Sequence, residues 1–299
     1  MWFKIGNLKG WEEAKKKFLV SPRKEKFLNF CCICVKVIFM LLLLMLTVIS
    51  AFVTCTLDIN EVTHYGNDQI FWHILFAAAI LGFLVLCRHI RAKLRDSWVE
   101  TVFSDLTREI NFSRVMILFH FVLGVFWVVS TQVQADADQW YCAEIASRQM
   151  FPDYDFIDYM PGGYAYNYPY QSGLILVMSL IFRLFGSMNY TAFQICNVIA
   201  LLIVDISLMK TAEYLESPSA KKVSSAMLVL FWPILFYTVF VYGNLIGLAF
   251  GTTALFFQYR YFKNRRFRDI VISCLMIGFA VMIKTNYLIF LIAMLIFLV

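Results

Sequence analysis

Residues 114–144 read RVMILFHFVLGVFWVVSTQVQADADQWYCAE, and this stretch decides the class of fold. Its first part, 114–133, is almost uncharged and about 20 residues long, the length that a helix needs to cross a bilayer. Two aspartates and two aromatic residues follow after a short polar link. The sequence therefore predicts a membrane-spanning helix that ends in a polar loop.

Composition extends this prediction to the whole chain. The 299 residues are 61% hydrophobic and only 15% charged, against about 45–50% apolar and 25% charged residues in soluble domains. A disordered chain is excluded as well, because such chains lack apolar surface to bury, whereas this one contains 30 Phe, 15 Tyr and 7 Trp. We expect an all-α integral membrane protein that contacts membrane lipids.

Apolar runs along the sequence predict a bundle of about eight transmembrane helices. A ninth run, 172–185, is short for a span and contains Arg183, so we expect an interfacial helix there. The eight candidate spans cover residues 30–54, 70–87, 114–133, 191–209, 223–241, 244–258, 270–283 and 287–299.

The distribution of Lys and Arg predicts the orientation. With the N-terminus in the cytoplasm, the inner segments carry most basic residues, whereas loop 56–69 carries none and 131–171 carries only Arg148. Basic loops stay preferentially on the cytoplasmic side of a membrane. Because this rule explains the net charge of +6, we expect no nucleic-acid partner.

These predictions divide the chain into three parts. Residues 1–27 form a basic cytoplasmic segment, and 28–113 form an accessory transmembrane hairpin with a cytoplasmic loop. Residues 114–299 form the main transmembrane core, which contains a large outer loop at 131–190. The final apolar run stops without a polar cap, so we expect the C-terminal end to be truncated.

Two carboxylates at the outer end of the 114–133 helix are candidates for chemistry. Asp136 and Asp138 lie two residues apart; a carboxylate placed there can act as a general base, and a pair can bind a divalent cation. The alternative is that both simply end the helix and face water. Apart from such a cation we expect no metal or other cofactor, because cysteine and histidine spacing typical of a metal site does not occur.

The outer loop continues with an acidic and aromatic stretch, 151–171, which reads FPDYDFIDYMPGGYAYNYPYQ. Aromatic faces stack on sugar rings, and carboxylates and amides bind their hydroxyls. An aromatic belt at the membrane surface would explain the tyrosines equally well, but it leaves the accompanying acids and the Pro-Gly-Gly turn unexplained. The candidates for substrate binding are Tyr141, Tyr168 and Gln171.

Several short motifs in this order resemble the GT-C superfamily of polytopic membrane glycosyltransferases, which use polyprenyl-phosphate-linked sugars. The motifs are DQWY (138–141), YPYQSG (168–173), LFGSMN (184–189) and IKTNY (283–287). The resemblance covers roughly 114–299 and implies a GT-C-like bundle with interfacial helices in its first catalytic outer loop. Two features depart from the family pattern: the hairpin that precedes the loop, and Gly243 and Asn244 where many relatives carry another acid or base.

The resemblance also implies roles. Asp138 would be the general base that activates an acceptor hydroxyl, Asp136 would assist it, and transfer would invert the anomeric carbon. The departing phosphate needs a cation at the outer face, for which Lys284 and Arg148 are candidates. The alternative for Lys284 is an ordinary lysine at the end of a span.

The predicted partners are a polyprenyl-phosphate-linked sugar donor and a lipid- or polymer-linked acceptor. The enzyme would lie in the plasma membrane of a bacterium or the endoplasmic reticulum of a eukaryote, facing the extracytoplasmic side. Two other classes compete with this hypothesis: a transporter, and a non-catalytic subunit of a membrane assembly. A transporter usually carries ionisable groups at mid-membrane, and after residue 114 the predicted spans carry few, among them Asp205 near one end.

Overall fold

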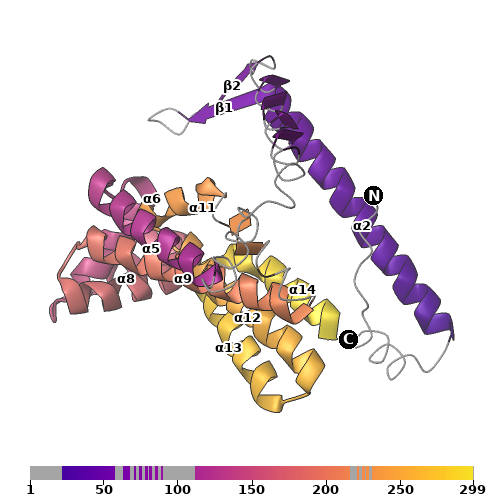
Figure 1. Ribbon diagram of the computed structural model, residues 1–299. Coiled ribbons are helices and arrows are strands. Elements are labelled where there is room, and N and C mark those ends of the chain that lie inside the picture. The colour runs from indigo at the N-terminus through magenta and orange to yellow at the C-terminus, as the bar shows by residue number, and fades with distance from the viewer. Residues whose placement is uncertain are drawn as a thin grey trace. The chain divides into compact units, whose positions relative to one another are not determined.

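A computed structural model describes residues 22–57, 63–67, 112–215 and 231–298, with scattered residues of 71–89 and 221–228. The chain divides into two compact units, Met1–Glu109 and Ile110–Val299. Figure 1 shows both, and each is described by itself below. Over the described residues the fold is helical, with one small β-hairpin.

The first unit is dominated by a long apolar helix, α2 (Pro22–Phe52). Its stretch Asn29–Ile49 is long and apolar enough to cross a membrane, and none of it is buried inside the protein. The predicted first span is thus confirmed as a helix. The helix begins inside the segment expected to be the basic N-terminal part, of which residues 1–21 lie outside the described residues.

A short β-hairpin follows α2, and apart from it the described residues have the helical fold that was expected. Strands β1 (Val53–Leu57) and β2 (Thr63–Asn67) pair antiparallel, with Val53 opposite Asn67 and Leu57 opposite Thr63. The segment is rich in β-branched residues, which favour strands. The described residues of the next predicted span, within 71–89, are helical.

The second unit is built on two membrane-length helices, α5 (Phe112–Thr131) and α9 (Tyr190–Leu215), which pack against each other. A buried hydrogen bond of 2.7 Å between His120 Nδ1 and Asp205 Oδ2 joins them. Polar pairs of this kind hold helices together where water is absent. Asp205 of α9 therefore has a structural partner.

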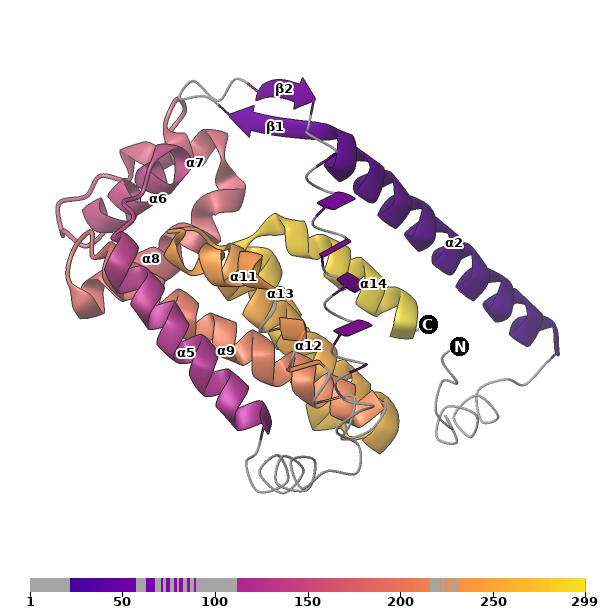
Figure 2. The ribbon, with the colours of Figure 1, turned by 45° about the horizontal axis from the view of Figure 1, so that its top comes forward.

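Three further helices complete this bundle: α12 (Asn244–Asn264), α13 (Phe267–Ile283) and α14 (Leu288–Leu298). Helix α12 packs against both α9 and α13, as Figure 2 shows. The turn between α12 and α13 uses Arg265 in the left-handed conformation, with φ of 54°. Such a residue ends a helix and allows the chain to reverse.

The run 223–241, expected as one span, is not one helix. Phe231 is non-helical, a short helix α11 (Trp232–Phe236) follows, and η3 (Tyr237–Val239) continues as a 3-10 turn. Pro233 lies in the first turn of α11, where its missing N–H costs nothing. A proline inside an apolar run therefore starts a new helix here.

Fewer helices qualify as spans than the eight that were expected. By length and composition, three helices of the described residues are candidate spans, or up to four if a bent pair counts as one. Helix α13 has 17 residues and α14 has 11, and α12 is diluted by polar residues such as Thr252 and Gln258. The coarser prediction, a helical membrane protein with several spans, is confirmed.

Between α5 and α9 lies a compact segment of short helices, at the position of the predicted outer loop. The two longer helices are α6 (Ala137–Arg148) and α8 (Ser172–Phe185). The helix expected at 172–185 has these same limits. Between them lie η1 (Ile157–Tyr159), α7 (Tyr164–Asn167) and η2 (Pro169–Gln171).

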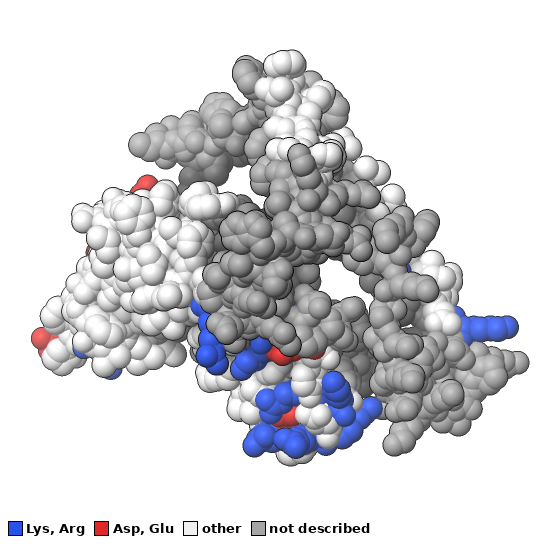
Figure 3. Space-filling view, in the orientation of Figure 1, with Lys and Arg blue, Asp and Glu red and all other residues white. Residues whose placement is uncertain are grey.

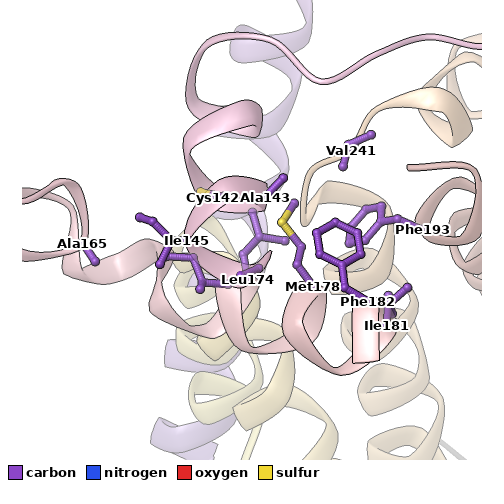
Figure 4. Packing of buried hydrophobic residues seen from close by; sticks show 12 residues of the cluster. Cys142, Ala143, Ile145, Ala165, Leu174, Met178, Ile181, Phe182, Phe193 and Val241 are labelled. Atoms are coloured by element: carbon purple, nitrogen blue, oxygen red, sulfur yellow. The ribbon is translucent and has the colours of Figure 1, made fainter. Parts of the chain in front are cut away.

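A hydrophobic core fixes α6 on α8. Figure 4 shows side chains of both helices meeting, with Phe193 of α9 beside Phe182. Both rings are fully buried, and burying one such side chain stabilises a fold by about 1.5–3 kcal/mol. The opposite face of α8 exposes Leu176, Leu180 and Leu184. An apolar outer face of this kind is what a helix lying in a membrane interface would need.

Basic residues gather at one end of the helical bundle. Figure 3 shows them at the turn between α12 and α13, where Lys263, Arg266 and Arg268 are exposed. These residues lie between the predicted spans 244–258 and 270–283. The orientation itself stays a prediction.

Candidate active site

Asp136 begins helix α6 as its N-cap. Its backbone is extended, and its side chain accepts a 2.8 Å hydrogen bond from the N–H of Ala137. The carbonyl oxygen of Asp136 accepts from the N–H of Gln139 as well. A capping aspartate stabilises a helix by satisfying free N–H groups and by its charge at the positive end of the helix dipole. The structure therefore gives Asp136 a local structural contact.

Asp138 lies in the first turn of α6, exposed, with one specific partner. The hydroxyl of Tyr164, from α7, donates a 2.8 Å hydrogen bond to Oδ1 of Asp138. The second carboxylate oxygen, Oδ2, has no described side chain bound to it. The geometry thus holds the carboxylate through one oxygen and leaves the other open.

A row of aromatic rings extends from this carboxylate. Tyr141 stacks on Tyr164, with ring centroids 5.1 Å apart and planes 11° apart. Tyr168 follows at 4.8 Å from Tyr164, and Tyr170 at 6.0 Å from Tyr168. Tyr141, Tyr168 and Tyr170 remain exposed. Two of the predicted substrate-binding residues, Tyr141 and Tyr168, therefore lie in one aromatic row beside Asp138.

The groups around Asp138 are held in their neutral, hydrogen-bonding forms. Burial, together with the hydrogen bond to Asp138, raises the pKa of Tyr164 well above its ordinary value. Burial also raises the pKa of the Cys142 thiol to about 12. Neither group ionises near neutral pH, so Tyr164 is a hydrogen-bond donor and Cys142 is not a thiolate nucleophile.

Two hydrogen bonds tie the outer segment to the link before α12. Gln139 Oε1 accepts a 3.1 Å bond from the N–H of Val241, and Gln171 Nε2 donates to the hydroxyl of Tyr242. Gln171 is buried, and its other amide atom, Oε1, has no partner among the described residues. These contacts bring residues about 70–100 positions apart into one site.

Two glycines let the end of α13 approach the same place. A Cβ on Gly173 would stand 1.9 Å from the carbonyl oxygen of Met282. A Cβ on Gly243 would stand 2.7 Å from Cγ2 of Ile283. Only glycine permits such close approach of a backbone, and Lys284 follows directly.

Lys284 completes the arrangement. Its Nζ lies 3.7 Å from the centroid of the Tyr242 ring, a cation–π contact. Burial lowers the pKa of Lys284, and the negative charge of Asp138 acts in the opposite direction. The predicted acid and the predicted lysine therefore share one electrostatic environment, although 146 positions separate them in the printed sequence.

Comparison with known proteins finds a family match for the part of the chain that contains Tyr242 and Lys284. Residues 173–299 match the family model described as dolichyl-phosphate-mannose-protein mannosyltransferase. The chain is a glycosyltransferase that depends on a polyprenyl-phosphate-linked sugar. Searches of curated proteins and of solved structures found no match.

The family match confirms the GT-C resemblance and covers part of the site. Gly173, Tyr242, Gly243 and Lys284 lie inside the matched segment, whereas Asp138 precedes it. The matched segment therefore contains Lys284 and its surroundings but not the Asp138 side of the candidate site.

Arg148, the other candidate for phosphate binding, lies apart from Asp138. It occupies the last turn of α6, about 15 Å along the helix axis from Asp138 at 1.5 Å per residue. Its guanidinium pairs with Glu144 at 2.8 Å and with Asp158 at 3.1 Å. Two carboxylates already neutralise this cation, so Lys284 is the better placed of the two.

Sequence reasoning did not single out Tyr164 or Tyr242 as functional residues of the glycosyltransferase. Tyr164 follows the Gly162-Gly163 turn, where Gly162 has a φ of +94° and allows the chain to turn toward α6. In the part of the chain that the structure describes, no cluster of His, Cys, Asp and Glu could hold a metal ion.

Proposed function

We propose that this glycosyltransferase moves mannose from a polyprenyl phosphate to an acceptor hydroxyl on the extracytoplasmic side of a membrane, with inversion and with Asp138 as general base. The observation that carries the proposal is the set of contacts that links the two groups: Gln139, next to Asp138, bonds to Val241, and Tyr242, which follows Val241, lies against Lys284. Mannose is the sugar named in the description of the matching family. The acceptor is a lipid- or polymer-linked molecule.

Asp138 supplies the base. A hydroxyl is a weak nucleophile at neutral pH, and a carboxylate within hydrogen-bond reach raises its reactivity as the new bond forms. The acceptor oxygen bonds to the anomeric carbon, its proton passes to Asp138, and the bond from that carbon to the phosphate oxygen breaks. Tyr164 holds Oδ1 of Asp138, so the acceptor hydroxyl uses Oδ2. Asp136 assists by holding the first turn of α6 in place.

Lys284 receives the leaving group. The electrons of the broken bond go to the phosphate, whose negative charge an ammonium stabilises most strongly where water is partly excluded. Lys284 is half-buried, and burial lowers its pKa. A negatively charged phosphate bound beside Lys284 favours the protonated ammonium and so opposes the effect of burial on its pKa. Arg148 contributes at most long-range attraction, because its guanidinium is already paired.

The aromatic row positions the sugars. Tyr141 and Tyr168 present ring surfaces beside Asp138, and sugar rings stack on such faces. Gln171 offers an unpaired amide oxygen at the lysine side of the site. A sugar hydroxyl is the type of donor that this oxygen lacks.

The topology is part of the proposal. The N-terminus lies in the cytoplasm, several helices cross the bilayer, and residues 131–190 form the outer catalytic loop, with α8 along the interface. The basic turn between α12 and α13 supports this orientation. In this arrangement residues 28–113 are an accessory hairpin and 114–299 the catalytic core.

The test replaces Asp138 by Asn, which keeps the size of the side chain and removes its basicity. Membranes containing the variant are supplied with dolichyl-phosphate mannose, and transfer to endogenous acceptor is measured. We expect a loss of about 100-fold to 10,000-fold in rate, the usual contribution of a general base.

The matched control is Asp153→Asn, which changes an exposed aspartate in the same outer segment. It should transfer mannose at the parent rate. If Asp138→Asn is as active as the control, Asp138 is not the base and the proposed mechanism is wrong.

A further inference from the structure

Tyr242 occupies an unusual position between the two halves of the site. Its ring lies beneath the ammonium of Lys284, 3.7 Å from centroid to Nζ. Its hydroxyl accepts a hydrogen bond from Nε2 of Gln171. The same side chain therefore contacts the cation through its face and the outer segment through its edge.

Among the described residues, the Tyr242 hydroxyl accepts a hydrogen bond but donates none. The lone pair faces Gln171, and within the described residues no acceptor takes the hydrogen. Burial raises the pKa of Tyr242, so this hydroxyl stays protonated at neutral pH. A half-buried hydroxyl with an unused hydrogen beside an ammonium is a ready donor to an anion.

Gln171 shows that the network lacks a partner. Its side chain is 1% exposed, yet Oε1 makes no hydrogen bond within the described part of the chain. Buried polar atoms are normally paired, and an exception calls for an explanation. A bound molecule with both acceptor oxygens and hydroxyls, such as a sugar phosphate, satisfies Tyr242 and Gln171 together.

The network also lies near the base. Gln139, which follows Asp138, accepts a 3.1 Å hydrogen bond from the N–H of Val241, which precedes Tyr242. A phosphate held by Tyr242 and Lys284 would therefore carry its sugar within reach of the Asp138 side of the site. In-line displacement needs the base and the departing phosphate at opposite ends of the reacting carbon.

We propose that the Tyr242 hydroxyl donates a hydrogen bond to the phosphate of the polyprenyl-phosphate donor, while its ring holds Lys284 toward the same phosphate. This inference rests on the proposed function. Tyr242 transfers no proton: the bond from the anomeric carbon to oxygen breaks, its electrons go to the phosphate, and the acceptor proton goes to Asp138. The hydrogen bond strengthens as charge develops on the phosphate.

The experiment compares Tyr242→Phe, which keeps the ring but removes the hydroxyl, with Tyr242→Leu, which removes both. Binding of polyprenyl phosphate to the purified full chain is measured, with polyprenol, which lacks the phosphate, as a second probe. We expect Tyr242→Phe to weaken polyprenyl-phosphate binding by about tenfold or more, as for loss of one hydrogen bond to a charged group. Tyr242→Leu should weaken it further. Polyprenol binding should not change in Tyr242→Phe.

Tyr237→Phe is the matched control, because Tyr237 is exposed and packs on Phe240 outside this network. It should bind both probes like the parent. Equal binding of polyprenyl phosphate by Tyr242→Phe and the parent would overturn the inference, and so would an equal loss of both probes. Asp138→Asn separates this result from the proposed function, because it should lose transfer while it keeps polyprenyl-phosphate binding.

Discussion

Replacing Gly173 by Ala tests whether the approach of α8 to the end of α13 builds the site. The added Cβ would stand 1.9 Å from the carbonyl oxygen of Met282 and 2.6 Å from its carbon, whereas non-bonded heavy atoms prefer about 3.5–4.0 Å. The obstacle is backbone, which cannot rotate away like a side chain. The two segments must therefore separate by more than about 1 Å.

Such overpacking lowers the free energy of unfolding by about 1–3 kcal/mol, and we expect the upper part of this range because backbone must move. Lys284 lies two residues beyond Met282 and would shift with it. A displacement of about 1 Å at a catalytic group can reduce the rate about 100-fold. Thermal unfolding of the purified protein should begin several degrees lower, and kcat/KM for dolichyl-phosphate mannose should fall.

The control is Gly278→Ala in the middle of α13, where an added Cβ meets nothing within 4 Å. Alanine is favoured over glycine in a helix by about 1 kcal/mol. This variant should be at least as stable as the parent and equally active. If Gly173→Ala unfolds at the same temperature as Gly278→Ala and keeps its activity, the close packing of α8 on α13 does not position Lys284.

Two further predictions follow from the charges and the cap. Because burial lowers the pKa of Lys284 from 10.5, its charge disappears at a lower pH than that of an ordinary lysine. The kcat/KM for the donor should therefore fall as pH rises toward 10.5. Lys284→Arg, which stays charged, should shift this fall to higher pH or remove it. If the fall at alkaline pH is the same in Lys284→Arg, the ionisation of Lys284 does not cause it. Asp136→Asn keeps the helix cap and should retain activity, whereas Asp136→Ala should lose about 1 kcal/mol of stability and a modest part of the rate. If both variants instead lose the rate equally and strongly while their unfolding is unchanged, Asp136 has a chemical role.

Local features of the sequence predicted the helices that are bounded by clear signals. Helix α8 could be placed at 172–185 because an apolar run is closed by Gly186, whose φ of +105° ends the helix. Helix α6 begins at Ala137, directly after Asp136, which caps it. The cap was visible in the sequence, but its carboxylate was considered only for catalysis or for facing water.

Features that depend on distant contacts were not predicted. The hairpin β1–β2 arises in a loop whose alternation is too short to stand out against the apolar runs around it. The run 223–241 has the composition of a span, but Pro233 starts a separate short helix within it. Tyr164 and Tyr242 were missed because their roles depend on partners from other segments, Asp138 and Lys284, that only folding brings close.

The structure suggests why acid and lysine come from such distant parts of the chain. Displacement at the anomeric carbon requires a base and a phosphate site on opposite sides of one small atom, at a fixed separation. The proposed base, Asp138, is carried by α6, and the proposed phosphate ligand, Lys284, follows the end of α13. The bond from Val241 to Gln139, the bond from Gln171 to Tyr242 and the contact of Gly173 with Met282 clamp these elements together. Two of these contacts are hydrogen bonds made by side chains, and the third is a close approach of backbones. Loosening any one of them should lower the rate of transfer before it unfolds the bundle.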